Sequence, residues 1–169
     1  MVKKRIFVIA LLVALLCFLF EVFKINSYIS PYIDFMFPKI KTEEQTKKFL
    51  NSNKNDIDKM IDNLNSLPYE NVEIFARSLL DDGTVFANGN EVDADSIIDK
   101  NLFSEYFKDK KIYYAEKCGE TIYFSTDTAR DYEQGIAYSK SDAPPSPTGN
   151  INIYSVDKIQ KNYYFYKAH

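Results

Sequence analysis

The longest apolar stretch of the chain lies near its beginning. Every residue from position 6 to position 20 is apolar, and the run resumes after Glu21 as far as Phe23. A basic tip at residues 3–5 precedes it. About 20 apolar residues span a bilayer, and an excess of lysine and arginine marks the cytoplasmic side. The pattern therefore predicts a single-pass protein with a transmembrane helix over 6–23 and the rest of the chain outside the cell.

Two other kinds of N-terminal segment fit the same residues. A cleaved signal peptide would give a secreted protein, although residues 25–27 match poorly the small side chains that cleavage prefers. A lipoprotein would carry its acyl chain on Cys17, but Leu16 stands where the bacterial lipobox has glycine or alanine. An uncleaved anchor needs neither feature. We therefore expect a cell-membrane protein with its N-terminus in the cytoplasm and its C-terminal domain extracytoplasmic.

The predicted anchor is followed by two further segments. Residues 24–41 contain Pro31 and Pro38, which interrupt any continuous helix. The predicted organisation is thus a cytoplasmic tip and anchor at 1–23, a juxtamembrane stalk at 24–41, and a single extracytoplasmic domain at 42–169.

Helical spacing dominates the first half of that domain. Thr42 and Gln45 have the spacing of a capping box. Apolar residues at helical spacing then continue to Pro68, which predicts a helix over about 42–67 with a break near 52–55. A second helix is expected after Asp93 or Asp95 and ends at the lysines around 108–111.

Strand-like runs account for the rest of the domain. Alternation predicts a strand over 72–79, a turn at Asp82-Gly83 and a short partner strand over 84–87. Five more strands are expected, and a proline-rich loop at 141–150 separates the last two from the others. The last five are expected over 112–116, 121–126, 132–140, 151–155 and 162–167. The predicted fold class is α+β, with the transmembrane helix followed by helices packed on one face of a mostly antiparallel sheet.

The composition excludes several kinds of chemistry but identifies no activity. The chain has 169 residues and a formal net charge of −3, and its basic tip lies outside the predicted domain, so a nucleic-acid partner is not expected. Cys17 falls in the predicted anchor and Cys118 in the domain, so these two cysteines cannot bridge within one chain. The single histidine is His169, the last residue, which excludes histidine-dependent triads and the usual zinc sites. No glycine-rich phosphate motif is present. We therefore predict no catalytic, cofactor-binding or metal-binding residues and no cofactor. A protein that is not an enzyme is the simpler explanation of this composition.

Arg130 and Asp131 are the one pair of neighbouring residues in the sequence that suggests a contact with a partner. Arginine offers two-pronged hydrogen bonding that lysine cannot reproduce, so Arg130 would hold an anion or carboxylate at the end of a hairpin. The alternative is structural: Arg130 fixes the hairpin loop by pairing with Asp127, Asp131 or backbone carbonyls.

Two weaker patterns have ordinary structural explanations. Cys118 beside Gly119 is a small turn residue more readily than a nucleophile, because no histidine lies near it in the sequence. Acidic residues between 81 and 95 suggest calcium, but they lack the spacing of an EF-hand and suit a solvated loop with a helix cap.

Three segments carry a resemblance to a group of proteins. The runs at 49–61, 130–139 and 163–166 (FLNSNKNDIDKMI, RDYEQGIAYS and YYFY) resemble small membrane-anchored or exported proteins of Gram-positive anaerobic bacteria, a group with no established activity. The resemblance implies a genuine folded domain and supplies no function.

Two classes of function fit these residues. The first is a membrane-tethered extracytoplasmic binding or interaction module for an unknown protein or envelope partner, in which tyrosines 154–166 supply aromatic anchors or simply pack on the sheet. An immunity-type protein is a variant of it. The second is an envelope hydrolase that uses carboxylates such as Asp127, Asp131 or Glu133. A pocket with two converging carboxylates of shifted pKa would favour the hydrolase, and a flat aromatic face would favour binding, which is the function we expect.

Overall fold

A computed structural model describes residues 41–109, 112–129 and 132–169. Its first element is helix α2 (Glu43–Ser66), whose capping box is formed as predicted: the Thr42 hydroxyl accepts from the Gln45 N–H, and the Gln45 side chain accepts from the Thr42 N–H. The helix runs without the predicted break near 52–55. One stripe of α2 is fully buried, because its apolar residues recur at helical spacing. These residues are Leu50, Ile57, Met60, Ile61 and Leu64.

The remaining elements alternate short helices with strands. Strand β1 (Asn71–Phe75) gives way directly to α3 (Ala76–Asp81), so the predicted strand over 72–79 ends early. The hairpin of β2 (Thr84–Ala87) and β3 (Asn90–Asp93) follows, with Asn88 and Gly89 at positive φ in its turn. Next come η1 (Ala94–Ser96), capped by Asp93, and α4 (Lys100–Lys108), capped by Asp99. The last strands are β4 (Tyr114–Cys118), β5 (Thr121–Ala129), β6 (Tyr132–Ser139), β7 (Ile153–Gln160) and β8 (Tyr163–Ala168).

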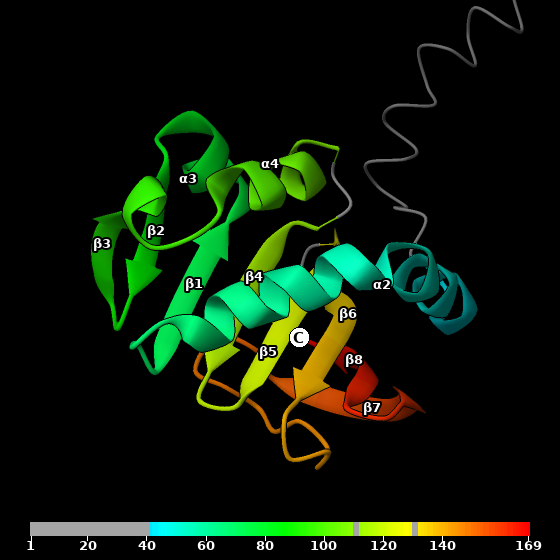
Figure 1. The fold of residues 1–169 in the computed structure, drawn as a ribbon. Helices are drawn as coiled ribbons and strands as arrows, with labels where there is room; N and C mark the ends of the chain where they lie inside the picture. Colours follow the sequence, from blue (N-terminus) through cyan, green and yellow to red (C-terminus); the bar gives the residue numbers. More distant parts are fainter. Residues whose placement is uncertain (1–40, 110–111, 130–131) are drawn as a thin grey trace, which may run out of the picture. The chain divides into compact units, whose positions relative to one another are not determined.

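All eight strands join one antiparallel sheet in the order β3-β2-β1-β4-β5-β6-β8-β7 (Figure 1). The predicted strand over 162–167 is the interior strand β8, and β7 forms the edge. Residues 163–166 are buried on both faces of the sheet, as is typical of an interior strand. Two register shifts interrupt the pairing of β7 with β8, a feature that discourages pairing at an exposed edge.

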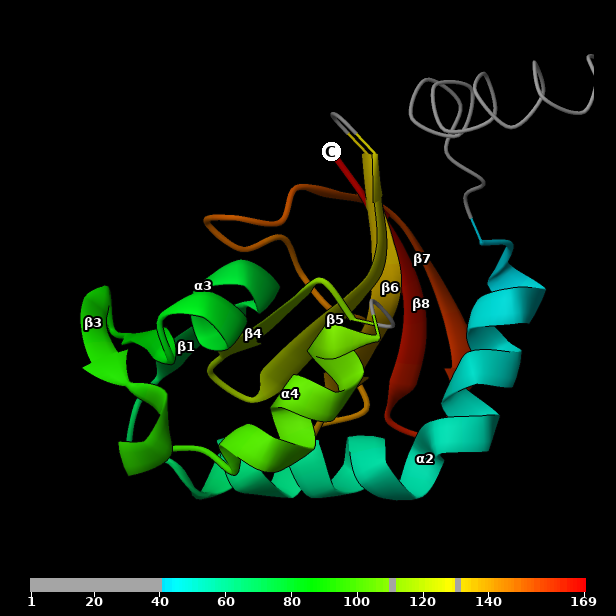
Figure 2. The same ribbon diagram turned by 90° about the horizontal axis from the view of Figure 1, so that it is seen from above.

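The two faces of the sheet are buried by different parts of the chain. One face, here the first face, carries Ile122, Phe124 and Ile136, which share an apolar cluster with α2 and α4. The opposite face carries a second cluster rich in tyrosine, together with Ile151 from the loop at 141–152, here the strap. Figure 2 shows α2 and α4 on one side of the sheet and the orange strap on the other. We call the second side the strap face.

Gly135 permits the close approach of β5 and β6. A Cβ at this position would lie 2.0 Å from the carbonyl oxygen of Phe124 and 3.0 Å from the Cα of Ser125. The register of β5 shifts between Ser125 and Asp127, directly opposite this glycine. A side chain at position 135 would therefore collide with backbone that no rotamer change can move.

The predicted fold class is wrong. The described chain is mostly an eight-stranded antiparallel sheet with few helices, and helices packed on one face are not its main feature. The prediction missed β3 and did not join the strands at 71–87 to those that follow in one sheet. It also treated one face as the only covered face, whereas the strap and its tyrosines bury much of the other.

The predictions that concern the membrane are also corrected. Within the part of the chain that the structure describes, no helix is both long enough and apolar enough to cross a bilayer. That finding gives no support to the predicted single-span anchor, membrane partner or cell-membrane localisation with an extracytoplasmic domain. The apolar run at 6–23 on which they rested lies outside the described residues.

Candidate interaction surface

A single cross-strand row connects the whole width of the strap face. Residues that pair across neighbouring antiparallel strands project their side chains from the same face of a sheet. From β3 to β7 the pairing links Glu91, Phe86, Glu73, Glu116, Tyr123, Ala137, Tyr164 and Lys158. The row therefore begins with three carboxylates and a phenyl ring, and two of those carboxylates, Glu73 and Glu116, stand directly opposite each other.

Two carboxyl groups on this face, those of the buried Glu116 and the half-buried Glu133, are held by tyrosines. The Tyr114 hydroxyl donates to Glu116 Oε2 at 2.8 Å, and Glu116 is only 4% exposed. The Tyr166 hydroxyl, fully buried, donates to Glu133 Oε1 at 2.5 Å. Glu116 and Glu133 also repel each other electrostatically. They form one carboxyl–tyrosine cluster, built from strands β4, β6 and β8.

Burial determines the protonation of this cluster. Loss of solvent raises the pKa of Glu116 above its usual range, and the charge of Glu73 raises it further, against the hydrogen bond from Tyr114. Burial likewise raises the pKa of Glu133, and Glu116 adds to that effect. The tyrosine partners shift in the same direction, since burial raises the pKa of Tyr114 and of Tyr166 well above the ordinary value. The cluster thus favours its neutral form.

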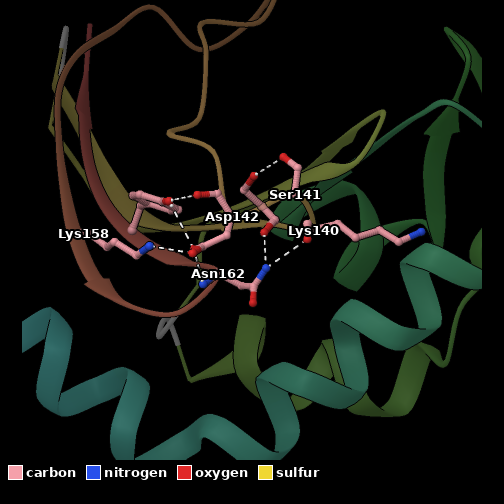
Figure 3. Close-up of polar contacts among 7 residues, drawn as sticks. Lys140, Ser141, Asp142, Lys158 and Asn162 are labelled. Carbon is pink, nitrogen blue, oxygen red and sulfur yellow. Dashed lines mark hydrogen bonds and ion pairs between the residues drawn. The ribbon is translucent and has the colours of Figure 1, made fainter.

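The strap covers this cluster and is fixed at both ends. At its first end, Asp142 accepts from Lys158 Nζ at 2.6 Å and from the Asn162 N–H at 2.6 Å (Figure 3). Both Asp142 and Asn162 have positive φ, and the Asn162 amide donates to the carbonyls of Ser139 and Lys140. These bonds tie the strap to the β7–β8 turn.

The second end of the strap contacts the carboxyl cluster directly. Asn150 Nδ2 donates to the Tyr114 hydroxyl at 3.2 Å, and Thr148 forms a hydrogen bond with Glu116. Between the two ends, the Tyr123 hydroxyl donates to the Ser146 carbonyl at 2.6 Å. The strap therefore covers β4, β5 and the strands beyond, but its bonds do not reach β1, β2 or β3.

The remaining part of the strap face presents rings beside carboxylates. Phe75 is 40% exposed, although its ring centroid lies 4.8 Å from that of Tyr114 and 5.9 Å from that of Phe86. Glu73 and Glu91 flank Phe86 as its paired neighbours on β1 and β3. We call Glu73, Phe75, Phe86 and Glu91 the aromatic–acidic surface.

This surface has carboxylates without matching cations. Within residues 41–109, 112–129 and 132–169, no lysine or arginine forms an ion pair with Glu73, Glu91, Glu116 or Glu133. Arg77, on the nearby helix α3, pairs with Asp81 instead. Like charges directly opposite each other on paired strands destabilise a sheet, and the Glu73–Glu116 pair avoids this repulsion as long as Glu116 keeps its proton, which the charge of Glu73 favours. Comparisons with protein families, curated proteins and solved structures give no match.

The residues predicted as a partner contact, Arg130 and Asp131, lie outside the described residues. The structure does separate the acids proposed for a hydrolase. Asp127 accepts from the Lys41 N–H at 2.6 Å, and burial lowers the pKa of the Lys41 amine beside it. Glu133 instead lies in the carboxyl–tyrosine cluster on the strap face. The carboxyl that accompanies Glu133 is Glu116, which sequence reasoning did not select.

The other candidates take structural roles. Cys118 ends strand β4, and burial raises the pKa of its thiol, with a further contribution from Glu116. Asp93 caps η1, and Asp95 pairs with Lys100. Among the described residues, no group of three histidine, cysteine or acidic side chains lies close enough to hold a metal ion. Of the C-terminal tyrosines, residues 163, 164 and 166 pack in the sheet, and Tyr154 is exposed and stacked on His169.

Proposed function

We propose that this domain is an interaction module that binds a cationic, partly apolar peptide segment on the aromatic–acidic surface. The observation that carries the proposal is the row in which Glu91, Phe86 and Glu73 alternate beside the exposed ring of Phe75. Carboxylates attract ammonium and guanidinium groups, and aromatic rings accept both apolar side chains and cations. Exposed aromatic residues are also the commonest anchors of protein interfaces.

Charge complementarity selects the occupant. Residues 42–169 hold more acidic than basic side chains, so the same domain of a second copy would bring like charge to this surface. A lysine- or arginine-bearing segment would supply the ion-pair partners that Glu73 and Glu91 lack among the described residues, and its apolar side chains would cover Phe75 and Phe86.

Hydrolysis by carboxylates is less well supported. Glu116 and Glu133 are the pair of carboxyl groups whose pKa values are raised. Each already accepts a hydrogen bond from a tyrosine hydroxyl, and Glu116 is covered by the strap. Neither lines the hollow around Asp82 and Lys100, the one beside the β7–β8 turn or the one under the strap.

Binding to a peptide of alternating lysine and leucine tests the proposal. A glutamate–leucine peptide reports on charge, and a lysine–serine peptide reports on apolar contact. We expect measurable affinity for the lysine–leucine peptide alone. Phe75→Ser should weaken it by about tenfold or more, as expected when an interface anchor is removed.

Matched variants outside the aromatic–acidic surface control for nonspecific effects. Tyr154→Ser removes an aromatic side chain that is 52% exposed, and Glu120→Gln removes an exposed carboxylate. Both should bind the peptide as the wild type does. Equal loss in Phe75→Ser and Tyr154→Ser, or equal affinity for all three peptides, would refute the proposed function.

A further inference from the structure

Glu116 lies directly beside the aromatic–acidic surface. It is the paired neighbour of Glu73 across β1 and β4, and paired residues of this kind have Cβ atoms about 4.5–5.5 Å apart. Glu73 is half-buried, whereas Glu116 is only 4% exposed. A bound cation can therefore reach Glu73 itself but must act on Glu116 through space.

The titratable groups around Glu116 are all acidic or neutral. They are Glu73 from β1, Tyr114 and Cys118 from β4, Tyr123 from β5 and Glu133 from β6. The strap adds only the uncharged side chains of Thr148 and Asn150. With burial and no neighbouring cation among these groups, the carboxyl of Glu116 retains its proton at a pH where an exposed glutamate has lost it.

We propose that a cationic side chain of the bound peptide, seated against Glu73, causes Glu116 to release its proton, so that binding and deprotonation are coupled. This inference rests on the proposed function. In this step the O–H bond of the Glu116 carboxyl breaks, the electron pair stays on the carboxylate, and the proton passes to the solvent. An opposite charge within about 4–6 Å favours the charged form of a carboxyl group, and the Tyr114 hydroxyl already donates to the resulting anion.

Calorimetry of the lysine–leucine peptide in two buffers measures this proton. Acetate and MES both buffer at mildly acidic pH and take up protons with different heats, so the binding heat differs between them only if protons are exchanged. Slightly above the ordinary glutamate pKa, at roughly pH 5–6, we expect wild-type protein to release up to about one proton per peptide. Glu116→Gln should bind as the protonated wild type does, with an affinity that does not change over this pH range, and release should disappear, because glutamine resembles the protonated acid. Glu105→Gln, an exposed change on α4, should keep the wild-type release.

The wild-type protein alone provides a second measurement. Because proton release couples to binding, its affinity for the peptide should rise with pH, by up to about tenfold per unit. Equal heats in the two buffers together with a pH-independent affinity would overturn this inference and leave the proposed function intact. Unchanged release in Glu116→Gln would do the same. Absence of any peptide binding by the wild-type protein would overturn both.

Discussion

The pH dependence of stability gives the sharpest test of the carboxyl–tyrosine cluster. Burial raises the pKa of Glu116 and of Glu133 in the folded protein, so the native state binds protons that the unfolded chain releases. The stability that these two groups contribute is fully present below about pH 4.3, the pKa of glutamate in the unfolded chain. It is lost as the pH rises through their pKa values in the folded protein. The domain should therefore become less stable from mildly acidic to neutral pH by this contribution.

The magnitude follows from linkage. Each group that stays protonated only in the folded state lowers the unfolding free energy by about 1.4 kcal/mol per pH unit, so the pair gives a slope of up to about 2.8 kcal/mol per unit. Glu116→Gln keeps a hydrogen-bond acceptor for Tyr114 and removes one titrating group. Its slope should be shallower by up to about 1.4 kcal/mol per unit, and it should be the more stable protein at neutral pH.

Urea unfolding of wild type and Glu116→Gln across this pH range measures the difference directly. Glu105→Gln, exposed on α4, serves as the matched control and should follow the wild-type curve. The difference between wild type and Glu116→Gln should be flat below about pH 4 and reach a plateau above the folded pKa of Glu116. The reasoning would be refuted if the two stability curves ran parallel, or if the wild type became more stable relative to Glu116→Gln as the pH rises.

Three further outcomes follow from single residues. Gly135→Ala should cost roughly 3 kcal/mol or more in chemical unfolding, because its Cβ meets backbone at 2.0 Å; a loss below about 1 kcal/mol would contradict that contact. Thr42→Ala should cost about 1 kcal/mol by loss of the capping box, whereas Thr128→Ala, at an exposed strand position, should cost less than about 0.5 kcal/mol; equal losses would disprove the cap's role. In a Cys17→Ser background, Cys118 should react with iodoacetamide more slowly in the folded than in the unfolded chain, because burial raises its thiol pKa, and faster reaction in the folded protein would reverse that assignment.

Local sequence signals predicted individual elements better than the architecture. The capping box at Thr42 and the apolar spacing after it gave α2, and the strand over 84–87 matches β2. Asn88-Gly89 is a strong hairpin signal that would have revealed β3. The positions of β7 and β8 depended on long-range pairing, which alternation alone does not specify.

The aromatic–acidic surface had no local signature. Glu73, Phe86 and Glu91 come from three strands, and only their register brings them into one row. The pairing of Glu116 with Glu73 depends on the same register. Sequence reasoning selected Glu133 as one acid among several but had no means of finding its neighbour Glu116, since nothing near either residue marks a motif.

The central claim is that the aromatic–acidic surface binds cationic, partly apolar peptides. Titration of isotope-labelled protein with the lysine–leucine peptide, followed by backbone amide NMR shifts, tests it most directly. We predict saturable shifts concentrated on β1, β2 and β3 around Phe75 and Phe86, with residues of α2 unaffected. Shifts centred on α2 or on the β7–β8 turn, or no shifts at all, would contradict it.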